Sequence, residues 1–212
     1  KSDSYTKRND RLINHHMYQK FLDKLRGLPV EKSNRDWIIF LHTFGGTMDA
    51  ALRFMERIYQ HRKKGHKVTA IVPRFALSAG TLIALACDNI FMEKYAELGP
   101  IDIQLMGIPV SSIDDVVTAK GAKASDISHL ANSIAHKAIE ELKEGLHKYV
   151  EHHSTDAIKF IDETLFQNHH THGKAYYIYD VKHIFSVEEL KDDLLKYSQE
   201  KVKIHEIMEI EC

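Results

Sequence analysis

The chain alternates short, unbroken apolar runs with longer stretches in which apolar residues recur at helical spacing. Trp37–Leu41 and Val68–Val72 are apolar or β-branched runs, which is typical of strands buried on both faces of a sheet. Between them, apolar residues from Met48 to Tyr59 recur every three or four positions opposite a charged face, which predicts an amphipathic helix. A small-residue helix is expected after Ser78, and a third strand at Asn89–Met92. This order of elements predicts an α/β fold with a mostly parallel sheet.

The second half of the chain has a more helical pattern. We expect a loop from Pro109 to Gly121, because Gly and Pro bound a stretch without clear periodicity. A long helix is expected from about Asp126 to His153, a second from Thr155 to about Phe166, and a short one near Val187–Leu195. The tail Val202–Ile210 alternates imperfectly and suits either an edge strand or an oligomer contact.

These patterns predict an N-terminal helical arm over residues 1–30, one α/β domain over residues 31–200, and a tail over residues 201–212. The formal net charge of −1 over 212 residues, with scattered Lys and Arg, excludes a basic footprint for nucleic acid. Only Cys87 and Cys212 are present, so a disulfide framework is not expected and a reducing, cytoplasmic compartment is favoured. The first residue is Lys1 rather than Met, so we expect an excised portion whose full-length form carries, as one alternative, a membrane anchor.

Ser78 is the residue with the most specific chemical context. It stands where a β-branched run ends and a small-residue helix begins, and such a junction exposes a hydroxyl beside unpaired backbone N–H groups. Gly45 and Gly46 occupy the equivalent junction after the preceding strand. Since carboxyl ends of parallel strands meet at one edge, the N–H groups of Ala79 and of Gly46 or Gly45 can point at one oxygen. Small residues at a helix start also serve close packing, and that structural interpretation has about equal weight for Ser78 alone.

Three segments resemble a known family. They are His42–Gly46, Ala76–Asp88 and Leu98–Gln104, within a similarity that covers about Asp36 to Leu105. These segments look like those of the serine dehydrogenase proteinase family, which is related to signal peptide peptidase A and to the proteolytic subunit of Clp. The resemblance implies the Clp/crotonase-like spiral of β-β-α units with a helical C-terminal part. It also implies a homo-oligomer, because a single spiral leaves apolar faces uncovered.

The resemblance further implies roles for individual residues. Ser78 would be the nucleophile of a serine peptidase, and the N–H groups of Gly46 and Ala79, with Gly45 beside them, would form the oxyanion hole. Thr47 and Met48 would receive the backbone of a peptide or protein substrate as an added strand.

The general base is less determined. A Clp-type histidine would fall near Asp102 to Gln104, where this chain has none, so a Clp-type triad is not favoured. Signal peptide peptidases use a lysine instead, and the resemblance to them implies a Ser–Lys dyad. Lys137 is the candidate, because on a helical wheel it lies about 20° from Leu130 at the edge of the apolar stripe. Its alternatives are a snorkelling surface role for Lys137, the weaker candidates Lys120 and Lys123, and His172 as a base.

Other histidines and the internal cysteine are assigned structural roles. No Cys, Asp or Glu completes a ligand set around His152–His153 or His169–His172, so no metal is expected. We expect a solvated helix end and a polar turn there, and a buried, unreactive thiol at Cys87. No cofactor is implied. Two other functions fit the same fold: a crotonase-like enzyme acting on coenzyme A thioesters, and a non-catalytic pseudo-peptidase scaffold.

Overall fold

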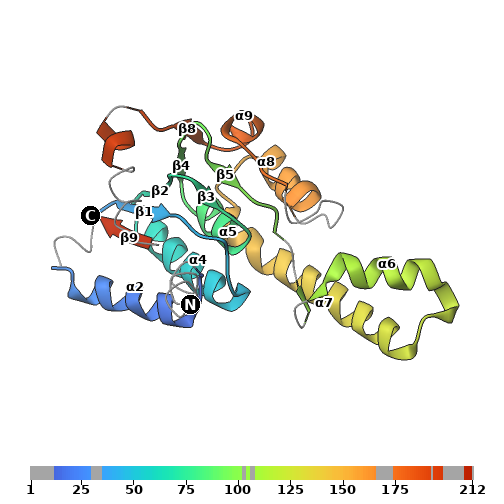
Figure 1. The fold of residues 1–212 in the computed structure, drawn as a ribbon. Coiled ribbons are helices and arrows are strands. Elements are labelled where there is room, and N and C mark those ends of the chain that lie inside the picture. The colour runs from blue at the N-terminus through green and yellow to red at the C-terminus, as the bar shows by residue number, and fades with distance from the viewer. Residues whose placement is uncertain are drawn as a thin grey trace, which may run out of the picture.

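A five-stranded sheet forms the centre of the chain in a computed structural model (Figure 1). The structure describes residues 12–29, 35–101, 104–105, 108–165, 174–191, 193–197 and 208–211. The strand order is β8-β4-β2-β1-β9, with β9 antiparallel to β1 and all other neighbours parallel. The strands are β1 (Trp37–Leu41), β2 (Val68–Val72), β4 (Asn89–Met92), β8 (Val187–Glu189) and β9 (Met208–Glu211). The three strands predicted from apolar runs are confirmed, and the tail supplies an edge strand.

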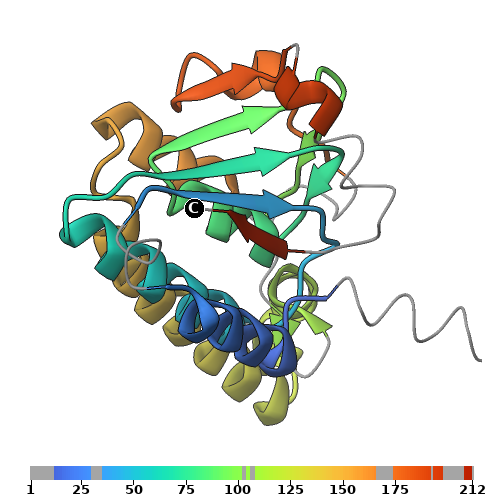
Figure 2. The same cartoon turned by 90° about the vertical axis from the view of Figure 1, so that its left-hand side faces the viewer.

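Helices cover one face of this sheet, and together they enclose the main core (Figure 2). Their apolar stripes explain the arrangement, since Phe54 and Ile58 of α4 are fully buried against the sheet residue Ile39. Phe21 of the predicted N-terminal arm is buried in the same cluster. These helices are α2 (His15–Gly27), α4 (Met48–Lys63), α5 (Ala79–Leu85) and the C-terminal part of α7 (Asp126–Val150).

A second row of short extended segments follows the strands of the main sheet. Thr43, after β1, bridges Ala76 in parallel, and β3 (Phe75–Ala76) pairs in parallel with β5 (Glu97–Leu98). The chain therefore repeats a main strand, a short strand and a helix: β1, Thr43 and α4 are followed by β2, β3 and α5, and then by β4 and β5. This repetition is the β-β-α spiral that the resemblance implied, and the predicted fold class is confirmed.

A helical hairpin projects from this body (Figure 1). It consists of α6 (Val110–Lys120), the 3₁₀ turn η1 (Gly121–Lys123) and the N-terminal part of α7, and it follows the short strands β6 (Gln104–Leu105) and β7 (Ile108–Pro109). The prediction of a loop from Pro109 to Gly121 is wrong. Val110 packs with Ala135 and Ile139 of α7, and Asp114 lies 2.9 Å from His136. Because α6 is rich in Ser and β-branched residues, packing against α7 rather than intrinsic propensity stabilises it.

The C-terminal part differs from prediction at one element. The helix expected near Val187–Leu195 is wrong over its first part, because β8 begins at Val187 and pairs with β4 from Ile90 to Met92, whereas a short helix does follow at residues 193–197. The open edge of β4 offers unpaired backbone groups, and they override the helical preference of the glutamates. Between α7 and β8 lie α8 (Thr155–Phe160), the π-helical turn η2 (Ile161–Leu165) and α9 (Ile178–Val181). Within the described ranges, no helix combines the length and apolarity needed to cross a membrane.

Candidate active site

Ser78 adopts a strained backbone conformation between β3 and α5. Its φ is 50° and its ψ is −114°, and it is the only non-glycine residue with positive φ in the described part of the chain. Such a conformation persists only when the surrounding structure enforces it, and it is common where a nucleophile is presented on a sharp strand-to-helix turn. The half-buried Ser78 is therefore presented at a tight elbow.

The glycine turn touches this elbow directly. A Cβ atom placed on Gly45 would lie 2.9 Å from the Ser78 Cβ, 2.9 Å from the Leu77 carbonyl oxygen and 3.5 Å from the Ala79 nitrogen. Gly45 also has a φ of 104°, which other residues rarely adopt. The structure thus brings Gly45, Ser78 and Ala79 together, and it requires glycine at position 45 for space and for conformation.

Two backbone N–H groups at this junction are available to a ligand. Ala79 is the first residue of α5, so its N–H has no acceptor within the helix. Gly46 is exposed, and among the described residues neither its N–H nor that of Ala79 has a hydrogen-bond partner. Unpaired N–H groups on adjoining turns are the kind of donors that hold an oxyanion.

Thr43 fixes the glycine turn to the Ser78 turn, a role that the sequence analysis missed. Its buried hydroxyl accepts a hydrogen bond from the Gly45 N–H at 3.1 Å and lies 3.2 Å from the Gly45 carbonyl oxygen. Its backbone N–H donates to Phe75 O at 3.1 Å, and its carbonyl accepts from the Leu77 N–H at 3.0 Å. A threonine two residues before a glycine is a local turn signal that could have indicated this role.

Thr81 connects α5 to the third unit of the spiral. Its fully buried hydroxyl lies 2.8 Å from both the Ala76 and the Gly99 carbonyl oxygens, and it accepts from the Gly99 N–H at 3.1 Å. A buried hydroxyl with three polar neighbours is specific to one arrangement of the helix. Thr81 therefore holds the start of α5 in place.

The segment before α2 forms part of the glycine turn. The Ile13 N–H donates to Gly45 O at 2.8 Å, and the Thr47 N–H donates to Ile13 O at 2.8 Å. A Cβ atom on Gly46 would overlap the Ile13 backbone, so this glycine is needed for the close approach of the two segments. The Thr47 N–H is thus engaged within the chain, and the strand-receiving role expected for Thr47 and Met48 stays a prediction.

The structure does not bring the predicted general base to the nucleophile within one chain. Lys137 is exposed on α7, and within the described residues it forms no hydrogen bond or salt bridge. Lys120 and Lys123 are exposed near the turn that joins α6 to α7. His172 lies outside the described residues.

The adjacent histidines hold the C-terminal end of α5, the helix that follows Ser78. The prediction of a solvated helix end is wrong, because His152 lies 2.8 Å from Cys87 O and His153 lies 2.7 Å from Leu85 O. Arg62 adds a hydrogen bond to Ala86 O at 3.2 Å. These side chains satisfy the carbonyl groups that α5 leaves unpaired at its C-terminal end.

Burial changes the titration of this cluster. Burial, together with the neighbouring His153, lowers the pKa of His152 to about 4. Burial also lowers the pKa of His153, so both rings are neutral at pH 7. Burial raises the pKa of the Cys87 thiol, which agrees with the predicted unreactive role.

A repeated β-β-α spiral with a strained serine beside two unpaired N–H groups defines the class of Clp-like serine proteinases. The chain belongs to the family of ClpP-like SDH-type serine proteinases, whose model matches residues 11–210.

Two similar proteins are known from Methanocaldococcus jannaschii. The uncharacterized protein MJ1495 is 35% identical over 120 residues, which is 57% of this chain and 40% of that protein. The uncharacterized protein MJ0137 is 35% identical over 145 residues, which is 66% of this chain and 50% of that protein. The chain thus spans half or less of the length of these relatives.

A solved structure shows the same fold. It is that of a mutant of the 1510-N membrane-bound stomatin-specific protease, with a TM-score of 0.56 and 16% identity. The similarity covers 88% of this chain and 78% of that one. At this identity, the likeness shows the Clp-like fold alone.

Proposed function

We propose that the chain is a serine peptidase domain in which Ser78 attacks the peptide carbonyl. The observation that carries the proposal is the contact of Gly45 with the strained Ser78 elbow. In that arrangement the Gly46 and Ala79 N–H groups would hold the oxyanion of the tetrahedral intermediate. Removal of one such donor typically raises the barrier by about 3–4 kcal/mol.

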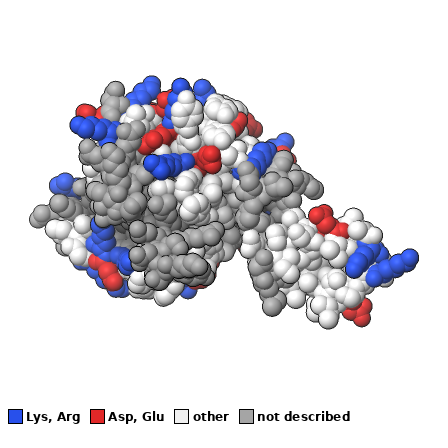
Figure 3. Space-filling view, viewed as in Figure 1, with Lys and Arg blue, Asp and Glu red and all other residues white. Residues whose placement is uncertain are grey.

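We propose that Lys137 is the general base and that it acts on Ser78 of a second copy. Lys137 is exposed on the projecting hairpin, whose visible face carries charged groups on its upper edge and toward its far end and is uncharged over much of the area between them (Figure 3). Close to it on α7, Ile127, Leu130 and Ile134 are 79%, 61% and 48% exposed at helical spacing. An apolar stripe of this kind on a projecting element favours association with another copy, which would desolvate the lysine and make it a better base.

The nucleophile is tested by labelling with a fluorophosphonate and by hydrolysis of fluorescent casein. Wild-type protein should be labelled and active, and Ser78→Ala should lose both properties. Ser186→Ala, at an exposed serine just before β8 and outside the projecting hairpin, is the matched control and should behave as wild type. Folded, assembled wild-type protein that is neither labelled nor active would refute the peptidase and favour the scaffold.

The base is tested by mixing two inactive variants. The Ser78→Ala variant retains Lys137, and the Lys137→Ala variant retains Ser78. If the base acts on the serine of the other copy, a mixed dimer therefore contains one complete site, with Ser78 from one variant and Lys137 from the other. After unfolding and refolding together, a dimer should recover about a quarter of wild-type activity. Sedimentation shows whether the variants assemble. Mixed oligomers without activity would refute a base supplied by the second copy. That result would not affect the conclusion about Ser78 as nucleophile, which rests on the labelling experiment.

A further inference from the structure

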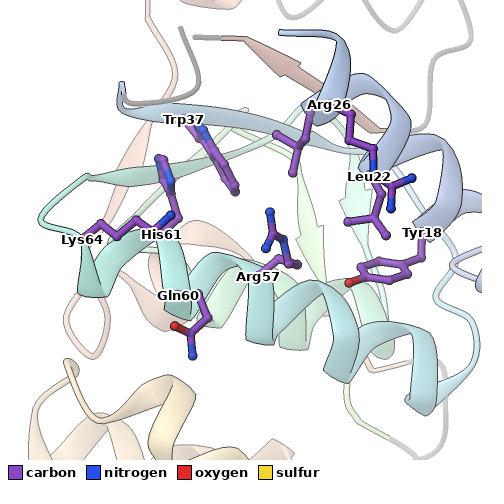
Figure 4. A pocket seen from close by; sticks show the side chains of 9 residues that line it. Tyr18, Leu22, Arg26, Trp37, Arg57, Gln60, His61 and Lys64 are labelled. Atoms are coloured by element: carbon purple, nitrogen blue, oxygen red, sulfur yellow. The ribbon is translucent and has the colours of Figure 1, made fainter. Parts of the chain in front are cut away.

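A cavity of about 490 Å³ lies between α2, α4 and the start of β1, away from the Ser78 elbow (Figure 4). One wall is apolar and is formed by Leu22, Leu25 and Trp37. The Trp37 ring is fixed, because it stacks on the His61 ring with a centroid distance of 3.6 Å and an interplanar angle of 12°. His61 is itself fixed by a contact of 2.7 Å between its Nε2 and the Arg35 carbonyl oxygen. The apolar wall is therefore preorganised.

The other side of the cavity is positively charged. Arg57 points from α4 into the space between Trp37 and Tyr18 (Figure 4), and Lys64 lines the cavity at the end of α4. Arg26 also lines the cavity, and it forms a salt bridge of 3.1 Å with Asp23, which does not line the cavity. No acidic side chain is among the described residues that line the cavity.

Arg57 differs from the other arginines of the same helix. Arg53 pairs with Asp49 at 3.0 Å, and Arg62 pairs with Asp88 at 3.1 Å. Among the described residues, neither Arg57 nor Lys64 forms a salt bridge. Two uncompensated cations beside an apolar wall favour an anion over a neutral ligand.

We propose that this cavity binds a small organic carboxylate with an apolar body. The carboxylate would accept hydrogen bonds from Arg57 and Lys64, and the guanidinium suits it because its donors match two carboxylate oxygens. The apolar body would lie against Leu22, Leu25 and Trp37. The volume is within the range of small-molecule sites, about 300–1,000 Å³. The proposal is independent of the peptidase activity.

The single tryptophan of the chain lines this cavity, so its fluorescence reports on binding directly. Octanoate, kept below its micelle concentration, should change the emission saturably. Octanol tests the need for the charge, acetate tests the need for the apolar body, and inorganic phosphate tests for an unspecific anion site. Each of these three should bind at least about tenfold more weakly than octanoate.

The variants Arg57→Gln and Lys64→Gln should each weaken octanoate binding about tenfold. Arg53→Gln, one turn earlier on the same helix and outside the cavity, should bind as wild type. Circular dichroism verifies that each exposed substitution leaves the fold intact. The proposal is overturned if octanoate gives no saturable change, if octanol or phosphate binds as tightly, or if both variants bind octanoate as wild type does.

Discussion

A position can require glycine because its φ is positive or because a Cβ atom would have no space there. Four glycines of this chain allow the two reasons to be measured separately. Gly145, inside α7, has ordinary φ and nothing near its Cβ position. Gly65 has a φ of 88° but open space, whereas Gly46 has ordinary φ and would place its Cβ on the Ile13 backbone. Gly45 combines a φ of 104° with a lack of space, because a Cβ atom added to it would lie 2.9 Å from Leu77 O and 2.9 Å from the Ser78 Cβ. Replacing each glycine by alanine therefore measures conformation and space separately.

The expected changes in the free energy of unfolding differ in sign and size. Gly145→Ala should stabilise the protein by about 0.5–1 kcal/mol, because it removes a flexible residue from a helix. Gly65→Ala should destabilise it by about 1–2 kcal/mol through the left-handed backbone alone. Gly46→Ala should destabilise it by about 1–3 kcal/mol through overlap with backbone that cannot rotate away. Gly45→Ala combines both effects, so about 2–5 kcal/mol is expected.

Urea unfolding followed by circular dichroism gives these values, and fluorophosphonate labelling measures the consequence for Ser78. Gly45→Ala and Gly46→Ala should lower the labelling rate, since both displace the turn beside the nucleophile. Gly65→Ala and Gly145→Ala should leave it unchanged. If Gly45→Ala destabilises the protein no more than Gly65→Ala does, the two turns do not touch and the reasoning about the site is refuted.

Two further predictions concern the support of α5. Thr81→Val keeps the shape of the side chain but removes the hydroxyl that faces the Ala76 and Gly99 carbonyl oxygens and is the nearer of the two acceptors of the Gly99 N–H, at 3.1 Å against 3.3 Å for Ala76 O. It should therefore destabilise the fold by about 1–3 kcal/mol in urea unfolding, and an unchanged midpoint would contradict this role. His152 has a folded-state pKa of about 4, below its unfolded value of about 6.5, so the unfolded state binds more protons between these limits and stability should fall as the pH drops through them. Because the residue is only partly buried, the loss is limited to roughly 1–2 kcal/mol, and His152→Gln should show a shallower decline between pH 7 and pH 5. An equal decline in both proteins would exclude His152 as its source.

The parts of the fold that local patterns determine could be predicted from the sequence. The strands β1, β2 and β4 are marked by apolar runs, and their turns are marked by Gly45–Gly46 and by the small residues after Ser78. These signals lie within a few residues of the structures they specify. Because parallel strands bring their carboxyl ends to one edge, the meeting of the two turns followed from the order of the elements.

Elements stabilised by distant partners could not be predicted in this way. The helix α6 depends on its packing against α7, and β8 depends on the open edge of β4. The roles of Ile13 and His152 depend on backbone groups far away in the sequence, at Gly45 and at Cys87. No local pattern at these positions indicates such partners.

The strained backbone of Ser78 has a consequence for how this protein evolves. A glycine would adopt the same conformation without strain, so the hydroxyl is kept at an expense in stability of about 1–3 kcal/mol. Under the proposed role of Ser78 as nucleophile, selection for folding alone would replace this serine, and only selection for its chemistry opposes that replacement. Descendants of this chain that lack the proposed activity are therefore expected to carry glycine at this position, so this single residue would distinguish active from inactive lineages.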